Sequence, residues 1–226
     1  SQPPVNLDFS PISMDMQAEY LKRFAMSPQK ASDYSFANVW GWAEEYGLEW
    51  YFGKSHVWIR QTKPKEVYWA PVGPWDSVDW TCCPSLGQIR HMIRVPETLA
   101  LNWKKSFPTG TIELVEARGH WDYIYSVEEL SELKGNRFHK KKNLLNQFKK
   151  KYTFAYMPMQ PECVEDVLQM QEEWVRWREV EDSSPLMAED HAIARVMKDW
   201  DRIPGLFGGT IHVDGASGGF LAPFVD

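Results

Sequence analysis

Residues 130–152 read LSELKGNRFHKKKNLLNQFKKKY and contain eight of the chain's 25 lysines and arginines. Between Lys134 and Lys151 there is one histidine and no acidic residue, although the whole chain has 31 acidic residues and a formal net charge of -6. An acidic protein that gathers a third of its positive charge into one segment fits two situations. The segment either meets an anionic partner or forms a strongly charged helix that is solvated by water.

The same segment is predicted to be a helix, because neither proline nor glycine interrupts it after Phe138. Its apolar residues recur at spacings of seven, three and four, which places them along one face. They are Phe138, Leu145, Phe148 and Tyr152, with Leu144 beside them. Lys141 falls within this apolar face. Its side chain therefore either extends past the aromatic rings to water or points into a pocket that binds a cation.

The composition predicts one large domain or two small ones with a sizeable core, since 43% of the 226 residues are hydrophobic. Cys82, Cys83 and Cys163 are an odd number, and two are adjacent, which matches neither a disulfide framework nor zinc-ligand spacing. We therefore expect a reducing, cytoplasmic location, with Cys82 and Cys83 packed as buried apolar residues. We expect no secretion leader, and because no apolar run of about 18 residues is present, any membrane contact is expected to be peripheral.

Predicted elements in the first half begin with helices and continue with strands. Helical segments are expected at 14–25 and 33–46, and strands at 48–52, 56–61 and 67–71. Short helices at 85–91 and 98–107 and strands at 111–117 and 121–125 follow. Ser126 is expected to cap a helix over VEELSEL.

The second half repeats this order after the basic helix. A strand is expected at 153–157, helices at 161–180 and 186–200, and a strand at 206–213, whereas residues 216–226 show no clear element. The repeated order predicts an α/β (α+β) fold of two similar units. These would span residues 1–129 and 153–226, with 130–152 as a basic connecting helix.

Four blocks of the sequence resemble a known family. They are DYSFANVWGWAEEYGLEWYF, VYWAPVG, WDYIYSVEELSELKGNRFHKKKNLLNQFKKKY, and the stretch from Glu173 through GLFGGTIHVDG. Together they resemble the family named for the C-terminal domain of phosphatidylglycerol lysyltransferase, over roughly residues 30–215. DYIYSVEELSELKGNRFHKKKN is the most specific match. The resemblance implies two GNAT-like units with central, mostly antiparallel sheets flanked by helices, related to the Fem-type transferases.

The resemblance also implies a reaction. Such proteins transfer an acyl or aminoacyl group to an amine or hydroxyl acceptor, with acyl-CoA or aminoacyl-tRNA as the donor. The chain shows no glycine-rich Q/R-x-x-G-x-G/A phosphate loop, which favours aminoacyl-tRNA. In the family the second unit continues past the strand that matches 206–213. This chain ends soon after Asp214-Gly215, so we expect its second unit to be truncated.

Candidate site residues follow from the charged segment and from family position. Donor phosphates would be bound by Lys134, Arg137, His139, Lys140, Lys141 and Lys142. The acceptor pocket would be lined by Trp174, Trp177, Arg178 and Glu189. No catalytic residue is identified, and the histidines lie too far apart to indicate a metal site. Two alternatives stay open: a non-catalytic nucleic-acid-binding protein that uses the basic helix, and an inactive relic of the fold.

Overall fold

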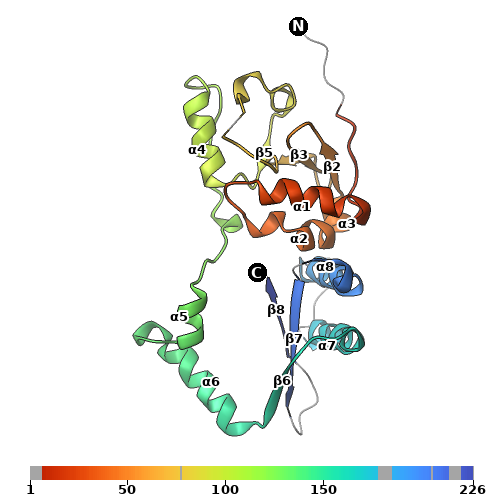
Figure 1. The fold of residues 1–226 in the computed structure, drawn as a ribbon, viewed down its shortest axis with the longest axis vertical. Coiled ribbons are helices and arrows are strands. Elements are labelled where there is room, and N and C mark those ends of the chain that lie inside the picture. Colours follow the sequence, from red (N-terminus) through yellow and green to blue (C-terminus); the bar gives the residue numbers. More distant parts are fainter. Residues whose placement is uncertain (1–6, 77, 178–184, 205, 214–219, 226) are drawn as a thin grey trace. The chain divides into compact units, whose positions relative to one another are not determined.

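The computed structural model describes residues 7–76, 78–177, 185–204, 206–213 and 220–225. The chain divides into two compact units. The first comprises Ser1–Trp121 and His191–Val196, and the second comprises Asp122–Asp190 and Met197–Asp226. Each unit contains a sheet that is entirely or mostly antiparallel, with helices beside it (Figure 1). The predicted mixed α/β class is therefore confirmed.

The sheet of the first unit has five strands in the order β1-β2-β3-β4-β5. The strands are β1 (Ser10–Pro11), β2 (Leu48–Phe52), β3 (Val57–Gln61), β4 (Val67–Trp69) and β5 (Met92–Ile93). Neighbouring strands from β1 to β4 are antiparallel, whereas β4 and β5 are parallel. The predicted hairpin of β2 and β3 is confirmed, with Trp50 opposite Ile59.

Helices of the first unit lie close to their predicted positions. They are α1 (Gln17–Ala25), α2 (Phe36–Gly41), α3 (Ala43–Tyr46) and α4 (Glu97–Ser106), with 3-10 turns at Met14–Met16, Ser32–Tyr34, Trp80–Cys82, Leu86–Gln88 and Arg118–His120. The Ser35 side chain accepts a hydrogen bond from the Asn38 backbone N–H at the start of α2, at 3.3 Å. Gly47, with a φ of 55°, ends α3 in the left-handed conformation.

The core of this unit is aromatic. Tyr20, Trp50, Trp69 and Trp80 are each at most 2% exposed. The ring of Trp50 lies 5.5 Å from that of Tyr20 and 5.0 Å from that of Phe52, between centroids. The tryptophans of the first half therefore mainly supply packing area, which is the ordinary role of large apolar rings.

Gly73 forms the turn after β4 and is held close to the β2–β3 loop. Its φ is 144°, a conformation that side chains disfavour. A Cβ at this position would lie 2.6 Å from the Ser55 backbone oxygen. The Gly73 N–H also donates to the Ser27 hydroxyl at 3.0 Å.

We therefore expect Gly73→Ala to lower the free energy of unfolding by about 1–3 kcal/mol, because the backbone must shift to accept the methyl group. Urea denaturation followed by tryptophan fluorescence measures this change. Gly87→Ala is the matched control, because a Cβ there has no atom within 4 Å. Equal stability of the two variants would contradict the steric explanation.

His56 is buried beside this turn, between the rings of Trp58 and Trp80. Its Nε2 lies 2.5 Å from the Pro74 carbonyl oxygen, to which it donates a hydrogen bond. Burial lowers the pKa of His56, the Pro74 carbonyl partly raises it, and the positive charge of Arg23 lowers it further. The folded protein therefore favours the neutral imidazole.

Because the folded-state pKa lies below the unfolded value of about 6.5, the unfolded chain binds more protons as the pH falls. The contribution of His56 to stability is present above that unfolded value and is lost as the pH drops through it. We expect the free energy of unfolding to decrease from about pH 7.5 to about pH 5.5, and His56→Gln to weaken this dependence. Denaturation at both pH values tests it, with His120→Gln at an exposed site as the control.

The second unit contains a three-stranded sheet and most of the remaining helices. Its strands are β6 (Phe154–Pro158), β7 (Leu206–Val213) and β8 (Phe220–Val225), antiparallel in the order β6-β7-β8. The helices are α5 (Val127–Glu132), α6 (His139–Lys151), α7 (Val164–Trp177) and α8 (Pro185–Lys198), and residues His191–Val196 of α8 are grouped with the first unit. No helix among the described residues is both long and apolar enough to span a membrane.

Several sequence predictions are wrong. Residues 111–117 and 121–125 form no strand, although they lie within the described residues, and most of their side chains are exposed. β8 occupies a segment for which no element was predicted. The cysteines also differ from expectation, because Cys82 is exposed and Cys83 is only half-buried. They lie in the long connection between β4 and β5, where the chain turns outward.

Candidate functional site

The basic segment begins at a well-defined turn after α5. The Ser126 hydroxyl accepts a hydrogen bond from the Glu129 backbone N–H at 3.3 Å, which confirms the predicted cap. Leu133, with a φ of 50°, ends α5, and Gly135, with a φ of 90°, precedes the 3-10 turn Asn136–Phe138. Positive φ at Gly135 carries little strain, so glycine suits the abrupt change of direction into α6.

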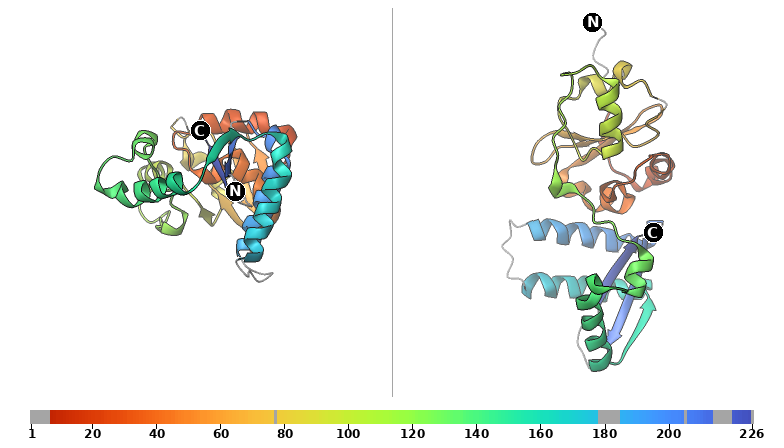
Figure 2. Two further views of the ribbon diagram at one scale, coloured as in Figure 1. Left: turned by 90° about the horizontal axis from the view of Figure 1, so that it is seen from below. Right: turned by 90° about the vertical axis from the view of Figure 1, so that its left-hand side faces the viewer.

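Helix α6 has 13 residues, which corresponds to a length of about 20 Å. Phe138, at its start, is buried. Near its end, the ring of Phe148 lies 5.2 Å from that of Tyr152 and 5.1 Å from that of Phe154 in β6. The apolar face therefore contacts protein at both ends. Leu144 in the middle of the helix is 66% exposed, and α6 leads directly into β6 (Figure 2).

Two of the predicted phosphate ligands are paired with carboxylates. The Lys134 Nζ lies 2.7 Å from Glu132, and Arg137 forms an ion pair with Glu129. The Arg137 guanidinium also lies 4.7 Å from the centroid of the Phe138 ring. These exposed pairs contribute little stability, and an anion with several charges can replace the carboxylates.

The other predicted phosphate ligands are exposed on the first turn of α6. His139 lies 3.3 Å from the Asn143 side-chain nitrogen. Lys140, Lys141 and Lys142 are exposed and take part in none of the ion pairs within the described part of the chain. Lys149 and Lys150 are exposed as well, and the Lys151 Nζ lies 5.0 Å from the centroid of the Tyr152 ring. The helix therefore presents positive charge along its length.

The predicted acceptor residues lie on α7 and α8. Trp174 is 40% exposed and Trp177 is 75% exposed, so neither is a core residue. Glu189 is exposed on α8. Arg178 lies outside the described residues. The cavity found in the described part of the chain is not lined by any of these side chains.

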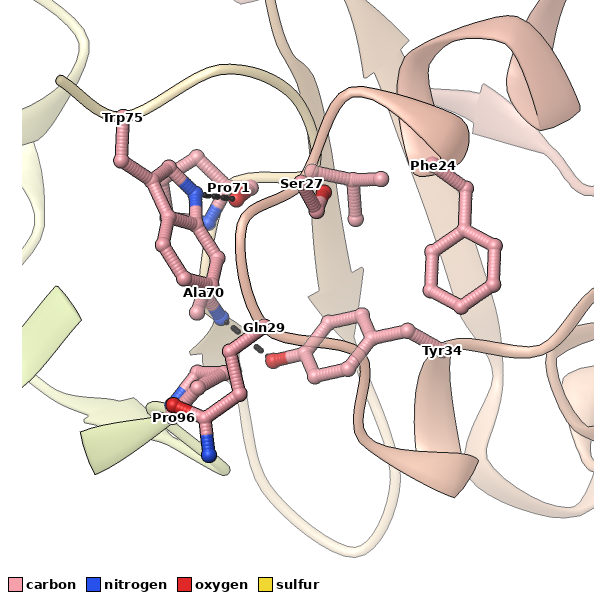
Figure 3. A pocket seen from close by; sticks show the side chains of 9 residues that line it. Phe24, Ser27, Gln29, Tyr34, Ala70, Pro71, Trp75 and Pro96 are labelled. Atoms are coloured by element: carbon pink, nitrogen blue, oxygen red, sulfur yellow. Dashed lines mark hydrogen bonds between the residues drawn. The ribbon is translucent and has the colours of Figure 1, made fainter. Parts of the chain in front are cut away.

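That cavity lies in the first unit, next to the carboxyl ends of β4 and β5 (Figure 3). Ligands often bind in crevices at the carboxyl ends of parallel strands. Here the space is only about 10 Å³, roughly that of one water molecule. Its lining residues are Phe24, Ser27, Gln29, Tyr34, Ala70, Pro71, Val72, Trp75 and Pro96.

Tyr34 closes this crevice with its own hydroxyl group. The hydroxyl accepts a hydrogen bond from the Ala70 backbone N–H at 2.9 Å (Figure 3). It also donates one to the Arg94 carbonyl at 2.8 Å. It thus joins the backbone just after β4 to the backbone just after β5. Burial raises the pKa of Tyr34, so the phenol stays protonated and can donate.

Arg94 completes the closure from the β5 side. Its φ of 56° is unusual for a residue with a side chain. The guanidinium forms an ion pair with Asp33 and lies 4.7 Å from the centroid of the Trp69 ring. These contacts offset the backbone cost. Sequence reasoning did not identify Tyr34 or Arg94, because no local spacing pattern relates residues that lie 36 or 60 positions apart.

We expect Tyr34→Phe to lower the free energy of unfolding by about 1–3 kcal/mol, because it leaves the buried Ala70 N–H and the partly buried Arg94 carbonyl without their hydrogen-bond partner. Chemical denaturation measures the loss, and hydrogen exchange at Ala70 should become faster. Tyr68→Phe is the control, since the Tyr68 hydroxyl donates to Glu66 at 3.3 Å on the surface. Its effect should stay within about 0.5 kcal/mol.

A family model described as "Phosphatidylglycerol lysyltransferase, C-terminal" matches residues 24–222. The matched range includes the closed crevice, the basic helix and the candidate acceptor residues. The comparison with curated proteins found no match.

The chain is also similar to the crystal structure of a conserved protein of unknown function from Bacteroides thetaiotaomicron VPI-5482. The TM-score is 0.80 at 24% sequence identity, and the match covers 93% of this chain and 73% of the other. At this level of identity the likeness concerns the fold alone.

Proposed function

Because the chain belongs to the phosphatidylglycerol lysyltransferase C-terminal family, we propose that it is a GNAT-like, Fem-related transferase that moves an aminoacyl group from tRNA to an amine or hydroxyl acceptor. In this reaction the acceptor nitrogen or oxygen attacks the carbonyl carbon of the aminoacyl ester. A new bond forms to that carbon, the ester bond to the tRNA breaks, and the acceptor proton ends on the released 3′-hydroxyl. Such a donor would place the protein in the cytoplasm.

The observation that carries this proposal is the exposed positive charge of α6 within the family match. Lys140, Lys141 and Lys142 lie on one turn, have no carboxylate partner in the described part of the chain, and are followed by three more lysines. A helix with so much unpaired charge is destabilised by repulsion between neighbouring lysines. Binding a polyanion removes that repulsion and releases counterions.

The length of α6 favours tRNA over a CoA thioester as the donor. Lysines spread over about 20 Å can contact several successive phosphates, because each nucleic-acid strand carries one charge per about 3.4 Å. A CoA molecule has few phosphates and is usually held in a concave site. The cavity beside β4 and β5, at about 10 Å³, is itself too small to hold CoA.

The acceptor is proposed to bind against α7 and α8. Trp174 and Trp177 offer exposed aromatic surface, and Glu189 offers a negative charge that suits an amine. Arg178, also proposed from family position, lies outside the described residues.

We expect the triple variant Lys140→Gln/Lys141→Gln/Lys142→Gln to bind bulk tRNA at least about tenfold more weakly near 0.1 M salt. The slope of log K against log salt concentration should fall in magnitude by about 2–3, or 0.7–0.9 for each lost phosphate contact. Fluorescence anisotropy with labelled tRNA measures both quantities. Lys104→Gln/Lys105→Gln, on the last turn of α4, is the matched control and should bind as the unmodified protein does.

An aminoacyl-transfer assay distinguishes the proposed enzyme from a nucleic-acid-binding protein that has no activity. Bulk tRNA charged with radiolabelled amino acids is incubated with the protein and with amine or phospholipid acceptors, and labelled product is counted. Transfer that the α6 triple variant loses supports the proposal. Native mass spectrometry with acetyl-CoA provides the opposing test, because a one-to-one CoA adduct without tRNA binding would overturn the choice of donor.

A further inference from the structure

The connection between β4 and β5, residues 70–91, is unusually long and contains the adjacent cysteines Cys82 and Cys83. Connections of this length without regular helices or strands are uncommon in compact domains and often carry function. This one is anchored by two buried tryptophans. The Trp75 indole N–H donates to the Pro71 carbonyl at 2.9 Å, and the Trp80 indole N–H donates to the Trp75 carbonyl at 3.2 Å. These bonds anchor Trp75 and Trp80, whereas Cys82 is exposed and Cys83 is half-buried.

Cys82 lies at the end of the 3-10 turn that begins at Trp80, next to the capping residue Asp79. The Asp79 carboxylate accepts hydrogen bonds from the Thr81 backbone N–H at 3.1 Å and from the Thr81 hydroxyl at 2.5 Å. These bonds, and then one from the Cys82 thiol, lower the pKa of Asp79. The Cys82 sulfur also lies 3.8 Å from the Thr81 hydroxyl oxygen.

Cys83 is held by backbone bonds that leave its side chain accessible. Its N–H donates to the Trp80 carbonyl at 3.3 Å, and its carbonyl accepts from the Gly87 N–H at 3.1 Å. The Cys83 side chain is half-buried and the Cys82 side chain is exposed, and both are free thiols. Two thiols on one fixed turn can thus reach the same ligand after rotation of their side chains.

A disulfide between these residues is disfavoured by geometry. Adjacent Cα atoms are about 3.8 Å apart, whereas disulfides normally span about 4.4–6.8 Å. A tetrahedral zinc site is not supported either, because the described residues contain no group of three or more histidine, cysteine, aspartate or glutamate side chains placed to hold a metal. Two thiolates without further ligands suit a soft centre of low coordination number.

We propose that Cys82 and Cys83 form a dithiol site that binds a soft, thiophilic metalloid or metal centre, such as trivalent arsenic, through both sulfur atoms. With phenylarsine oxide as the ligand, two arsenic–sulfur bonds form and the two S–H bonds break. The oxide oxygen takes both thiol protons and leaves as water, so that neither arsenic nor sulfur changes oxidation state. The site lies in the first unit and is independent of the proposed transfer reaction.

Binding has a structural consequence that can be measured. It removes the Cys82 thiol proton from Asp79 and draws the sulfur away from Thr81, so side-chain contacts within this turn change. The same turn positions Trp80, whose ring centroid lies 5.6 Å from that of Trp103 and 5.2 Å from that of His56. We therefore expect ligand binding to change the tryptophan fluorescence.

The experiment is titration of the reduced protein with phenylarsine oxide, followed by tryptophan fluorescence and by intact mass spectrometry. One arsenical should bind per chain, a small 1,2-dithiol should remove it, and an equal concentration of a monothiol should not. Cys82→Ser and Cys83→Ser should each weaken binding at least about 100-fold, because each loses the gain from two linked sulfurs. Cys163→Ser is the matched control and should bind as the unmodified protein does.

We expect both serine variants to remain folded, because serine keeps a small polar side chain at each position. Thermal unfolding of the two variants checks this. Binding that survives in either single variant would overturn the proposal, as would loss of binding in Cys163→Ser. Failure of the tRNA experiments would leave this result unchanged, because the dithiol titration requires neither α6 nor a donor.

Discussion

The first unit depends on the hydrogen bonds of one buried tyrosine, Tyr34. Its backbone carbonyl accepts from the Tyr20 hydroxyl of α1 at 2.7 Å, and its own hydroxyl joins Ala70 to Arg94. The helices before the sheet are thereby connected to the two parallel strands at its far edge. The bonds to Tyr20 and Ala70 are buried and the bond to Arg94 is partly buried, so an unpaired group at these positions would cost more than the bond itself contributes. The arrangement fixes the strand ends and leaves no room for a ligand between them.

Charge imposes the corresponding constraint on the second unit. Six of the 13 residues of α6 are lysines. The side chains of this helix are mostly exposed, so water can solvate the charges. In the described part of the chain, carboxylates of α5 form ion pairs with Lys134 and Arg137, which come before α6, and not with the lysines of α6 itself. Two aromatic contacts, from Phe138 and Phe148, hold the ends of the helix. Packing therefore determines where α6 lies, while its positive charge stays exposed to solvent.

The sequence predicted best those features that depend on interactions between residues close together in the chain. The hairpin of β2 and β3 and the cap at Ser126 follow from turn residues and local spacing, and each was found where expected. The basic helix predicted over residues 130–152 is shorter in the structure, because α5 ends at Glu132, a turn follows, and α6 spans His139–Lys151. Residues 111–117 have strand-like composition but lack a partner in the described sheets, and a strand requires a neighbouring ladder as well as suitable residues. Exposure of Cys82 depends on how Trp75 and Trp80 anchor their loop, which composition does not encode.

The apolar surface of the second unit adds to the argument from charge. All five residues of β6 are exposed, including Phe154, Tyr156 and Met157, and β6 is the edge strand of its described sheet. Exposed aromatic rings beside a basic helix form the combination with which proteins bind unpaired nucleotides, since bases stack on the rings while lysines contact phosphates. A charged helix that is only solvated by water would carry lysines but would not require exposed aromatic rings beside it. For the aminoacyl-tRNA donor that we propose, the exposed rings beside α6 would add base stacking to the phosphate contacts of the lysines.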